Sequence, residues 1–364
     1  EKKPKIDYAG AALLALVLAT IVLAVDNTAT TFAGLMDWAN ISLLTLRIIM
    51  AGIIAAGLVA LVAVERRAEQ PTLPLKTFKN MNFLRIVGVS ILFGVGFMGS
   101  ILYLTQFNQQ VFGASPTESG LMLLPMMAGI MSAAIGSGQI ISRVGRYKIF
   151  MQIGIVLATV MIALLATLTP ESPYWHEAIM MFGVGLGLGL VMPVLNIAVQ
   201  SEFKQSELGV ATSSVQLFRG LGSTIGIAVF GALLTNGIAS HLTNIQDNAY
   251  VKSLAGSEEV KKIGDLTDSN TLLTLNTPDV KEKINDGFTS ATANLPAPVK
   301  EQATKMFDKN QAEYSDKITH AFSDSLRQLF IISAVTMGLA SFFVFTLKER
   351  ELKHADPSVT PGEA

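Results

Sequence analysis

The sequence predicts an all-α polytopic membrane protein with eight transmembrane helices. Of its 364 residues, 50% are hydrophobic and only 15% are charged, and the mean hydropathy is +0.47. Soluble domains carry about 25% charged residues. The absence of cysteine excludes a disulfide framework, a thiolate metal site and a cysteine nucleophile. A net charge of −1 without a basic block also argues against a nucleic-acid partner.

Eight apolar stretches are each long enough to cross a bilayer core of about 30 Å. Helix-start signals support two of their borders. Residues 115–118 (SPTE) form a capping-box pattern before the fourth stretch, and Ser172-Pro173 repeats its first part before the sixth. In chain order, the predicted spans are 8–26, 41–64, 83–108, 119–141, 149–168, 175–199, 210–236 and 326–347.

The connections between these stretches alternate in charge. Fourteen Lys and Arg residues lie before the first span and after every second one, whereas the short connections 27–40, 109–118 and 169–174 have none. Short basic loops remain in the cytoplasm. We therefore expect a multi-pass protein of the cell membrane with both ends of this chain in the cytoplasm.

Segment 238–324 differs from the rest because it holds 22 of the 55 charged residues. By parity it lies outside the cell. Thr277-Pro278-Asp279 predicts a helix start, and apolar residues recur at helical spacing after Pro298, which predicts an extracytoplasmic helical hairpin. Disorder is the alternative. The predicted organisation is two helices and a cytoplasmic linker (1–80), five helices (81–237), the outer hairpin (238–324), and the last helix with a cytoplasmic tail (325–364).

Polar side chains inside predicted spans are candidates for function, because they are costly to place in lipid. Arg219 lies about 14 Å from the cytoplasmic end of the seventh span, where it acts in conformational coupling or forms a structural pair. Tyr103 and Gln106 share a helical face with Gln110, which predicts either an outward-opening pocket for an amphipathic ligand or an interfacial belt. The candidates for lining a substrate cavity are Tyr103, Gln106, Asn196, Gln216 and Arg219. Asn196 and Gln216 could instead bind neighbouring helices.

Small residues are concentrated in the sixth and seventh spans. Their spacing allows helices to approach closely, and proline supplies bend points. The pattern is explained by tight packing alone or by helices that rock against each other. The residues concerned are Pro125, Gly185, Gly189, Pro193, Gly222 and Gly226.

Signs of an enzyme are missing from the sequence. It has no Gly-x-Ser-x-Gly elbow, no Walker loop and no zinc-protease histidine pair, so we expect no metal and no cofactor. No acid lies in the middle of a predicted span. Glu177, at the outer end of the sixth span, is either a helix-dipole residue of the first turn or a titrating group.

A short turn between the fourth and fifth spans carries a known motif. Residues 138–148 (GQIISRVGRYK) resemble the signature G-x-x-x-D-R-x-G-R-[RK] of the major facilitator superfamily, in the copy typical of its C-terminal half. Ser142 replaces the acid, which weakens a role as a charged lock. Residues 114–129 (ASPTESGLMLLPMMAG), 216–234 (QLFRGLGSTIGIAVFGALL) and the start of the first span resemble the 14-helix drug:proton antiporters of the EmrB/QacA type.

This resemblance implies the C-terminal portion of a multidrug efflux antiporter associated with antibiotic resistance. It implies that the chain consists of two inserted helices followed by a six-helix bundle and lacks the N-terminal six-helix bundle of the family. The chain also starts with Glu1 instead of Met, as expected for a fragment. The expected partners are the lipid bilayer, a lipophilic or cationic small molecule and the missing bundle, with the proton as coupling ion. The gating turn would comprise Gly138, Ser142, Arg143, Gly145 and Arg146. The alternative is a non-transporting eight-span protein whose segment 238–324 binds a partner.

Overall fold

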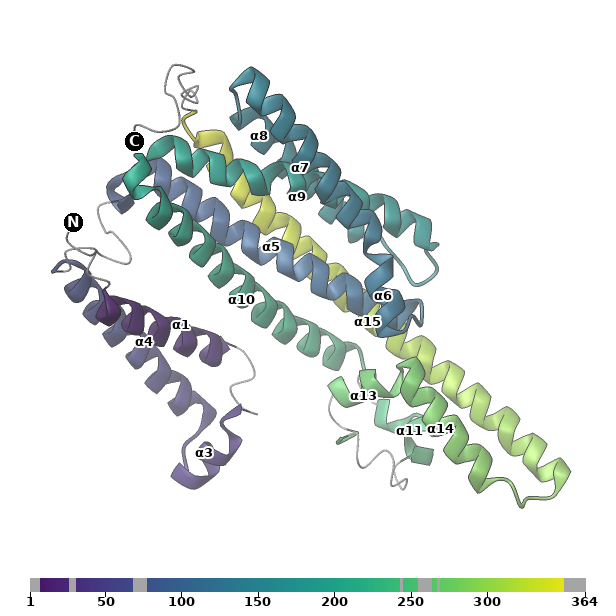
Figure 1. Cartoon of the computed structure of the whole chain (residues 1–364). Helices are drawn as coiled ribbons and strands as arrows, with labels where there is room; N and C mark the ends of the chain where they lie inside the picture. The colour runs from purple at the N-terminus through teal and green to yellow at the C-terminus, as the bar shows by residue number, and fades with distance from the viewer. Residues whose placement is uncertain are drawn as a thin grey trace.

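The computed structural model describes residues 7–25, 31–67, 77–242, 245–254, 264–266 and 269–349, in which every regular element is a helix. The first three helices are α1 (Tyr8–Val25), α3 (Ala33–Ala39) and α4 (Leu43–Glu65). α1 packs along α4, as Figure 1 shows, and it also contacts α10 (Leu208–His241). The two ends of the chain, 1–6 and 350–364, and residues 68–76 of the predicted linker lie outside the described residues.

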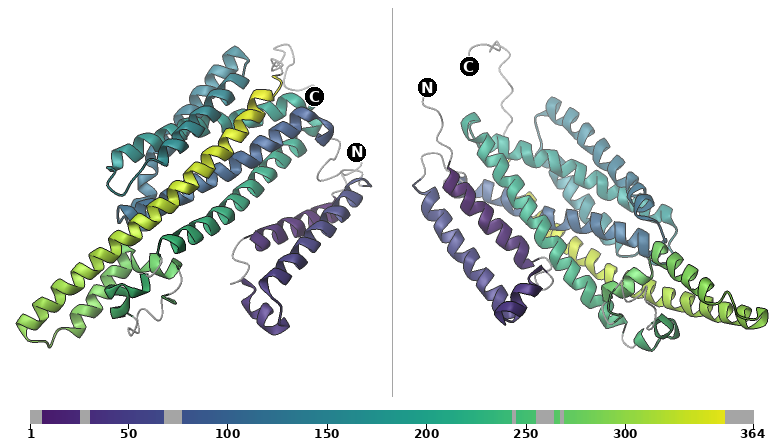
Figure 2. Two further views of the ribbon diagram at one scale, coloured as in Figure 1. Left: turned by 180° about the vertical axis from the view of Figure 1, so that it is seen from behind. Right: turned by 60° about the horizontal axis from the view of Figure 1, so that its bottom comes forward.

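A larger bundle follows this hairpin. α9 lies against both α7 and α8, α10 lies along α5, and the long α15 contacts α5, α8 and α10 (Figure 2). Its helices are α5 (Met81–Val111), α6 (Pro116–Met122), α7 (Leu124–Val144), α8 (Lys148–Leu165), α9 (Tyr174–Glu202), α10 and α15 (Ala297–Thr346). Short 3-10 turns occupy Thr77–Lys79, Gln205–Glu207 and Ile245–Asp247.

We name the two ends of this bundle by what they carry. The basic end holds the α7–α8 turn, the start of α5 and the end of α15, with Arg143, Arg146, Lys148 and Lys348. The loop end holds the α5–α6 and α8–α9 connections, the helices between α10 and α15, and the first half of α15. These names refer to the fold alone.

Glycines lie where helices of the bundle approach most closely. A Cβ atom on Gly185 or Gly189 would collide with the backbone of α7, at Met126 and Ile130 respectively. Gly222 and Gly226 meet the backbone of α5 in the same way, at Ile91 and Val95. Larger side chains would therefore push α7 from α9 and α5 from α10.

Prolines lie at a break and inside a helix. Pro125 belongs to the first turn of α7, directly after the break at Leu123 that separates α6 from α7, whereas Pro193 lies within α9. The predicted fourth span thus consists of two consecutive helices, α6 and α7, that are separated at Leu123. Whether these positions bend during function stays a prediction.

Seven of the described helical segments are long and apolar enough to cross a membrane. They include α6 and α7 taken together as Pro116–Val144, and the last one is the whole of α15. The predicted first span corresponds to a shorter apolar helix, Tyr8–Ala24. The number of eight crossings therefore stays a prediction, while an all-helical architecture with seven candidate spans is observed among the described residues.

The two helix-start signals predicted at span borders have different outcomes, whereas the one at Thr277 is confirmed by the start of α14 at Pro278. The capping box is confirmed: the Ser115 hydroxyl accepts a hydrogen bond from the Glu118 backbone N–H, and the Glu118 carboxylate accepts one from the Ser115 N–H. The signal before the sixth span marks the border correctly, since α9 begins at Tyr174, but the N-cap residue is Pro173 and not Ser172. The Ser172 hydroxyl accepts a hydrogen bond from the Thr169 N–H instead, within the loop.

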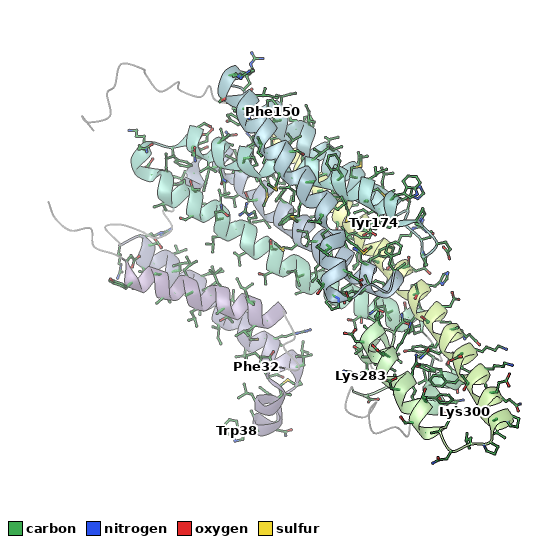
Figure 3. All side chains as sticks on the ribbon, turned by 45° about the vertical axis from the view of Figure 1, so that its right-hand side comes forward. Phe32, Trp38, Phe150, Tyr174, Lys283 and Lys300 are labelled. Carbon is green, nitrogen blue, oxygen red and sulfur yellow. The ribbon has the colours of Figure 1, made fainter. Side chains whose placement is uncertain are left out.

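The described part of segment 238–324 is helical. α11 (Ala249–Leu254), α13 (Ser269–Leu275) and α14 (Pro278–Ala291) pack beside the first half of α15, with aromatic side chains in their shared core. The Phe288 and Phe307 rings stack at 4.1 Å, and the buried Tyr314 hydroxyl donates to the Leu272 carbonyl at 2.8 Å. Lys283 and Lys300 mark this hairpin in Figure 3.

Candidate functional site

A cavity of about 290 Å³ lies between α5 and α10 near the loop end. Four α5 side chains line it on one side and residues of α10 on the other, while α13 and α15 contribute the remaining wall. We call it the α5–α10 cavity. Its lining residues are Tyr103, Gln106, Gln109, Gln110, Gly231, Leu234, Thr235, Ile238, Leu273, Thr274 and Phe322.

Tyr103 is held in this cavity by α10. Its side chain is buried, its hydroxyl donates to the Ile227 carbonyl at 3.1 Å, and its ring packs edge-on against Phe230 at 6.2 Å. The hydroxyl also lies beside Gly231, where a larger side chain would fill the cavity. The contacts with α10 therefore fix the orientation of the Tyr103 ring, and one edge of this ring faces the cavity.

Gln110 connects the end of α5 to the helices between α10 and α15. Its amide nitrogen donates to the Leu273 carbonyl at 3.3 Å, and its amide oxygen accepts from Asn276 at 3.4 Å. Asn276 in turn accepts from the Ser315 hydroxyl, to which Lys281 donates, each at a distance of 2.7–2.8 Å. One chain of hydrogen bonds thus runs from α14 through α15 to the cavity wall.

The predicted cavity residues are divided between two places. Tyr103 and Gln106 line the α5–α10 cavity, as their shared helical face predicts. Gln216 and Arg219 lie nearer the start of α10, away from the cavity. There the Arg219 guanidinium donates to the Gln216 amide oxygen, and Gln216 is exposed. Asn196 is half-buried in α9 and does not line the cavity. The roles of all five residues stay predictions.

The predicted gating turn has a defined backbone. α7 ends with Gly145 in a left-handed conformation (φ 70°), and its N–H donates to the Ile141 carbonyl at 2.8 Å. Only glycine adopts this conformation without strain. Ser142, which replaces the acid of the motif, donates its hydroxyl proton to the Gln139 carbonyl. Arg143 and Arg146 are exposed, and Gly138 has open space around it.

Two glutamates hold the basic end together, and the sequence reasoning missed both. Glu349, just after α15, accepts hydrogen bonds from the backbone N–H groups of Tyr147 and Lys148 at 2.9 and 3.1 Å. It therefore caps the start of α8 across a sequence distance of about two hundred residues. The signal in the sequence was weak, since a glutamate after a span resembles any charged tail residue.

Glu202, at the end of α9, is the second of these glutamates. Asn80 donates to its carboxylate at 2.9 Å, and Asn82 donates to the other carboxylate oxygen. The Asn82 side chain also donates to the Lys348 carbonyl and accepts from the Lys348 N–H, at 3.0 and 2.9 Å. Asn82 thus joins α5, α9 and the end of α15.

Glu177 is buried to a degree that the sequence did not indicate. It lies in the first turn of α9 but its side chain is fully enclosed, next to the equally enclosed Asn108 of α5. An asparagine in the last turns of a mostly apolar helix was the available signal for this pair.

Comparisons with known proteins agree with the helical, multi-span architecture. Residues 6–227 match the family model described as Major Facilitator Superfamily. Multidrug transporter protein MdtP of Bacillus subtilis (strain 168) is 30% identical over 302 residues, which cover 82% of this chain and 52% of that protein. A tetracycline resistance determinant of Streptomyces rimosus is 30% identical over 229 residues, covering 63% of each chain.

A third relative is an uncharacterized MFS-type transporter of Mycobacterium tuberculosis (strain ATCC 25618 / H37Rv). It is 34% identical over 237 residues, which cover 64% of this chain and 33% of that protein. The chain therefore spans between a third and two thirds of the length of these curated relatives.

Proposed function

Because the chain belongs to the Major Facilitator Superfamily, we propose that it is the C-terminal portion of a transporter that exports lipophilic or cationic drugs in exchange for protons. Two of its relatives are named as a multidrug transporter and a tetracycline resistance determinant. These names favour transport over the non-transporting alternative and over an enzyme. The proposed subtype is the 14-helix EmrB/QacA type, and the location is the cell membrane.

The observation that carries this proposal is the polar surface of α10. Arg219 and Gln216 are hydrogen-bonded to each other, Gln216 and Gly220 are exposed, and Arg219 and Thr224 are half-buried. α10 is nevertheless long and apolar enough to span a membrane. Hydrocarbon does not solvate a guanidinium group, so such residues face water or a partner helix bundle. We infer that this surface lines a central substrate pathway.

The same surface supports a partner for this chain. In alternating access, one bundle rocks against another around a site between them. The polar strip of α10 would face a second six-helix bundle, and the close glycine contacts of α5 with α10 would keep this half rigid as it moves. Multidrug transporter protein MdtP and the Mycobacterium tuberculosis transporter are longer than this chain, which leaves room for such a bundle within a longer whole protein.

The proposed orientation places the basic end in the cytoplasm and the outer hairpin outside. Basic residues of short loops remain on the cytoplasmic side of a membrane. Arg143, Arg146, Lys148 and Lys348 lie together at that end. The α5–α10 cavity is then near the outer surface, where an exported compound would leave.

The test uses the full-length protein that contains this chain, in everted membrane vesicles. Addition of a proton gradient should drive uptake of at least one lipophilic cation or antibiotic. Arg219→Ala should lower the initial rate about tenfold, since a charge lost from the pathway weakens binding throughout the cycle. Lys204→Ala, an exposed cation at the basic end, is the matched control and should retain the rate. Vesicles without proton-linked transport of any compound would refute the proposal.

A further inference from the structure

The structure buries one carboxyl group inside the bundle at the loop end. Glu177 of α9 and Asn108 of α5 are each 0% exposed. Among the described residues, the contact found for the Glu177 carboxyl group is the Asn108 amide, and no ion pair to a cation is observed. A carboxyl group enclosed in this way is costly as an anion, and taking up a proton removes that cost.

The geometry of the pair fits both protonation states. One terminal atom of the Asn108 amide lies 2.8 Å from Oε1 and 2.9 Å from Oε2 of Glu177. When that atom is the nitrogen, it donates to both oxygens of a carboxylate. When the amide is turned over, its oxygen accepts a hydrogen bond from the protonated acid. A half-turn of one side chain therefore gives either state a hydrogen-bond partner, although for the anion this partner is a single neutral amide.

The other polar groups around the pair already have partners. The Ser119 hydroxyl of α6 donates to the Thr105 carbonyl at 2.7 Å, and the Tyr174 hydroxyl of α9 donates to the Met122 carbonyl at 2.9 Å. The Phe112 ring packs edge-on against Tyr174, which Figure 3 labels at this end of the bundle. No second donor is thus held ready for the carboxylate by these neighbours.

Most charged and titratable groups around the pair are engaged or exposed, and the half-buried His176 packs its ring against Trp175 at 3.7 Å. Tyr174 has an electrostatic interaction with Glu177, as expected for a group one turn away on the same helix. Glu118 on α6 is exposed and binds in its capping box, and Glu171 before α9 is exposed and pairs with His320 of α15 at 3.2 Å. The remaining charged side chains at this end of α15 are all exposed: Asp316, Lys317, Asp324 and Arg327. The charges of α7 and of the start of α8, Arg143 and Lys148, lie at the basic end.

We propose that Glu177 and Asn108 form a proton-binding site between α9 and α5. A proton from water bonds to a carboxylate oxygen as the Asn108 amide turns its oxygen toward it, and the reverse step returns the proton to water. The protonated pair keeps α5 and α9 closed at the loop end. Loss of the proton leaves an anion with one amide donor, so the two helices separate to admit water. Nothing in the transported compound is needed for these steps.

Infrared difference spectroscopy of the purified full-length protein tests the site directly. The wild-type protein should show the C=O stretching band of a protonated carboxyl group that disappears as the pH rises. Glu177→Gln should abolish this band, because the neutral amide keeps the shape of the acid but takes up no proton. Glu171→Gln, the matched exposed control, should retain it. A band of unchanged amplitude in Glu177→Gln would overturn the proposal, as would its absence from the wild type.

A second variant keeps the test decisive if Glu177→Gln fails to fold. In Asn108→Leu the acid remains but the amide does not, so the band should shift in frequency and its midpoint should move to higher pH. An unchanged band and midpoint would show that Asn108 takes no part. This inference deepens the proton side of the proposed function, but no substrate enters the measurement. Failure of drug export with an intact band would therefore refute the transport proposal alone.

Discussion

At the basic end of the bundle, Glu202 receives hydrogen bonds from two asparagines and Glu349 receives two from the backbone of α8. At the loop end, Glu177 faces a single amide and is fully enclosed. Glu349 is exposed and Glu202 is only half-buried, so water also reaches the carboxylates of the basic end. Donor number and access to water therefore both differ between the two ends.

This difference teaches what each end can do. Several donors and partial solvation stabilise a permanent anion, which makes a fixed latch between helices. One reversible donor in a dry site stabilises neither state strongly, which suits a group that changes its protonation. Two variants at the basic end test this contrast, and a third tests a buried cation at the loop end; they are given in order of expected effect.

The largest effect is expected from Asn82→Ala at the basic end. The change removes a donor to Glu202 and two hydrogen bonds to the Lys348 backbone, and it leaves a half-buried carboxylate with fewer donors. We expect the free energy of unfolding to fall by about 2–3 kcal/mol. Chemical denaturation in detergent measures it, with the exposed Gln328→Ala as control. A loss no larger than that of the control would mean that the latch does not stabilise the bundle.

A smaller effect is expected from Glu349→Ala. This variant uncaps the start of α8, where Tyr147 and Lys148 lose the acceptor of their N–H groups. Since Glu349 is exposed, water replaces part of the interaction, and we expect a loss of about 1 kcal/mol in the free energy of unfolding. Hydrogen exchange of the first turn of α8 should become faster while that of α9 stays unchanged. Equal acceleration in both helices would contradict a local cap.

The smallest effect is expected from Lys281→Met in α14 at the loop end, where burial lowers the pKa of the lysine. Above this lowered pKa the unfolded chain binds more protons than the folded one, so the stability of the wild type should rise with pH until the ordinary lysine pKa of about 10.4 is passed. Lys281→Met removes this rise and the hydrogen bond to Ser315, with a net change of about 1 kcal/mol or less. Thermal unfolding across alkaline pH measures it. Parallel pH profiles of the two proteins would exclude a role for Lys281 in the rise.

Local signals in the sequence predicted much of the fold. The apolar stretches correspond to α1, α4, α5, α6 with α7, α8, α9, α10 and the second half of α15, because spans in lipid need a length and hydropathy that are visible without tertiary structure. The capping box at Ser115 was found for the same reason, since all its partners lie within three residues. Ser172 was misjudged because the loop before α9 offered its hydroxyl another donor, the Thr169 N–H.

The candidate site was predictable only where one helix supplies it. Tyr103, Gln106 and Gln110 were grouped correctly by their spacing on α5. The opposite wall comes from α10 and α13, and no spacing rule connects residues more than a hundred positions apart. Arg219 and Gln216 were grouped with Tyr103 by their polarity, but they lie on a different part of α10 from the residues that line the cavity.

The sequence by itself determined the local properties of the chain: which segments are apolar, which are charged, near which residues helices start, and where small residues occur. These properties depend on neighbours along the chain. The tertiary structure decided which carboxyl groups are satisfied and which are enclosed, because hydrogen-bond donors for Glu177, Glu202 and Glu349 come from helices distant in sequence. In the sequence the three residues look alike, as glutamates near the ends of helices. Packing of α5 against α9 makes one of them a buried acid, while the contacts of α5 and α8 at the basic end make the other two helix anchors.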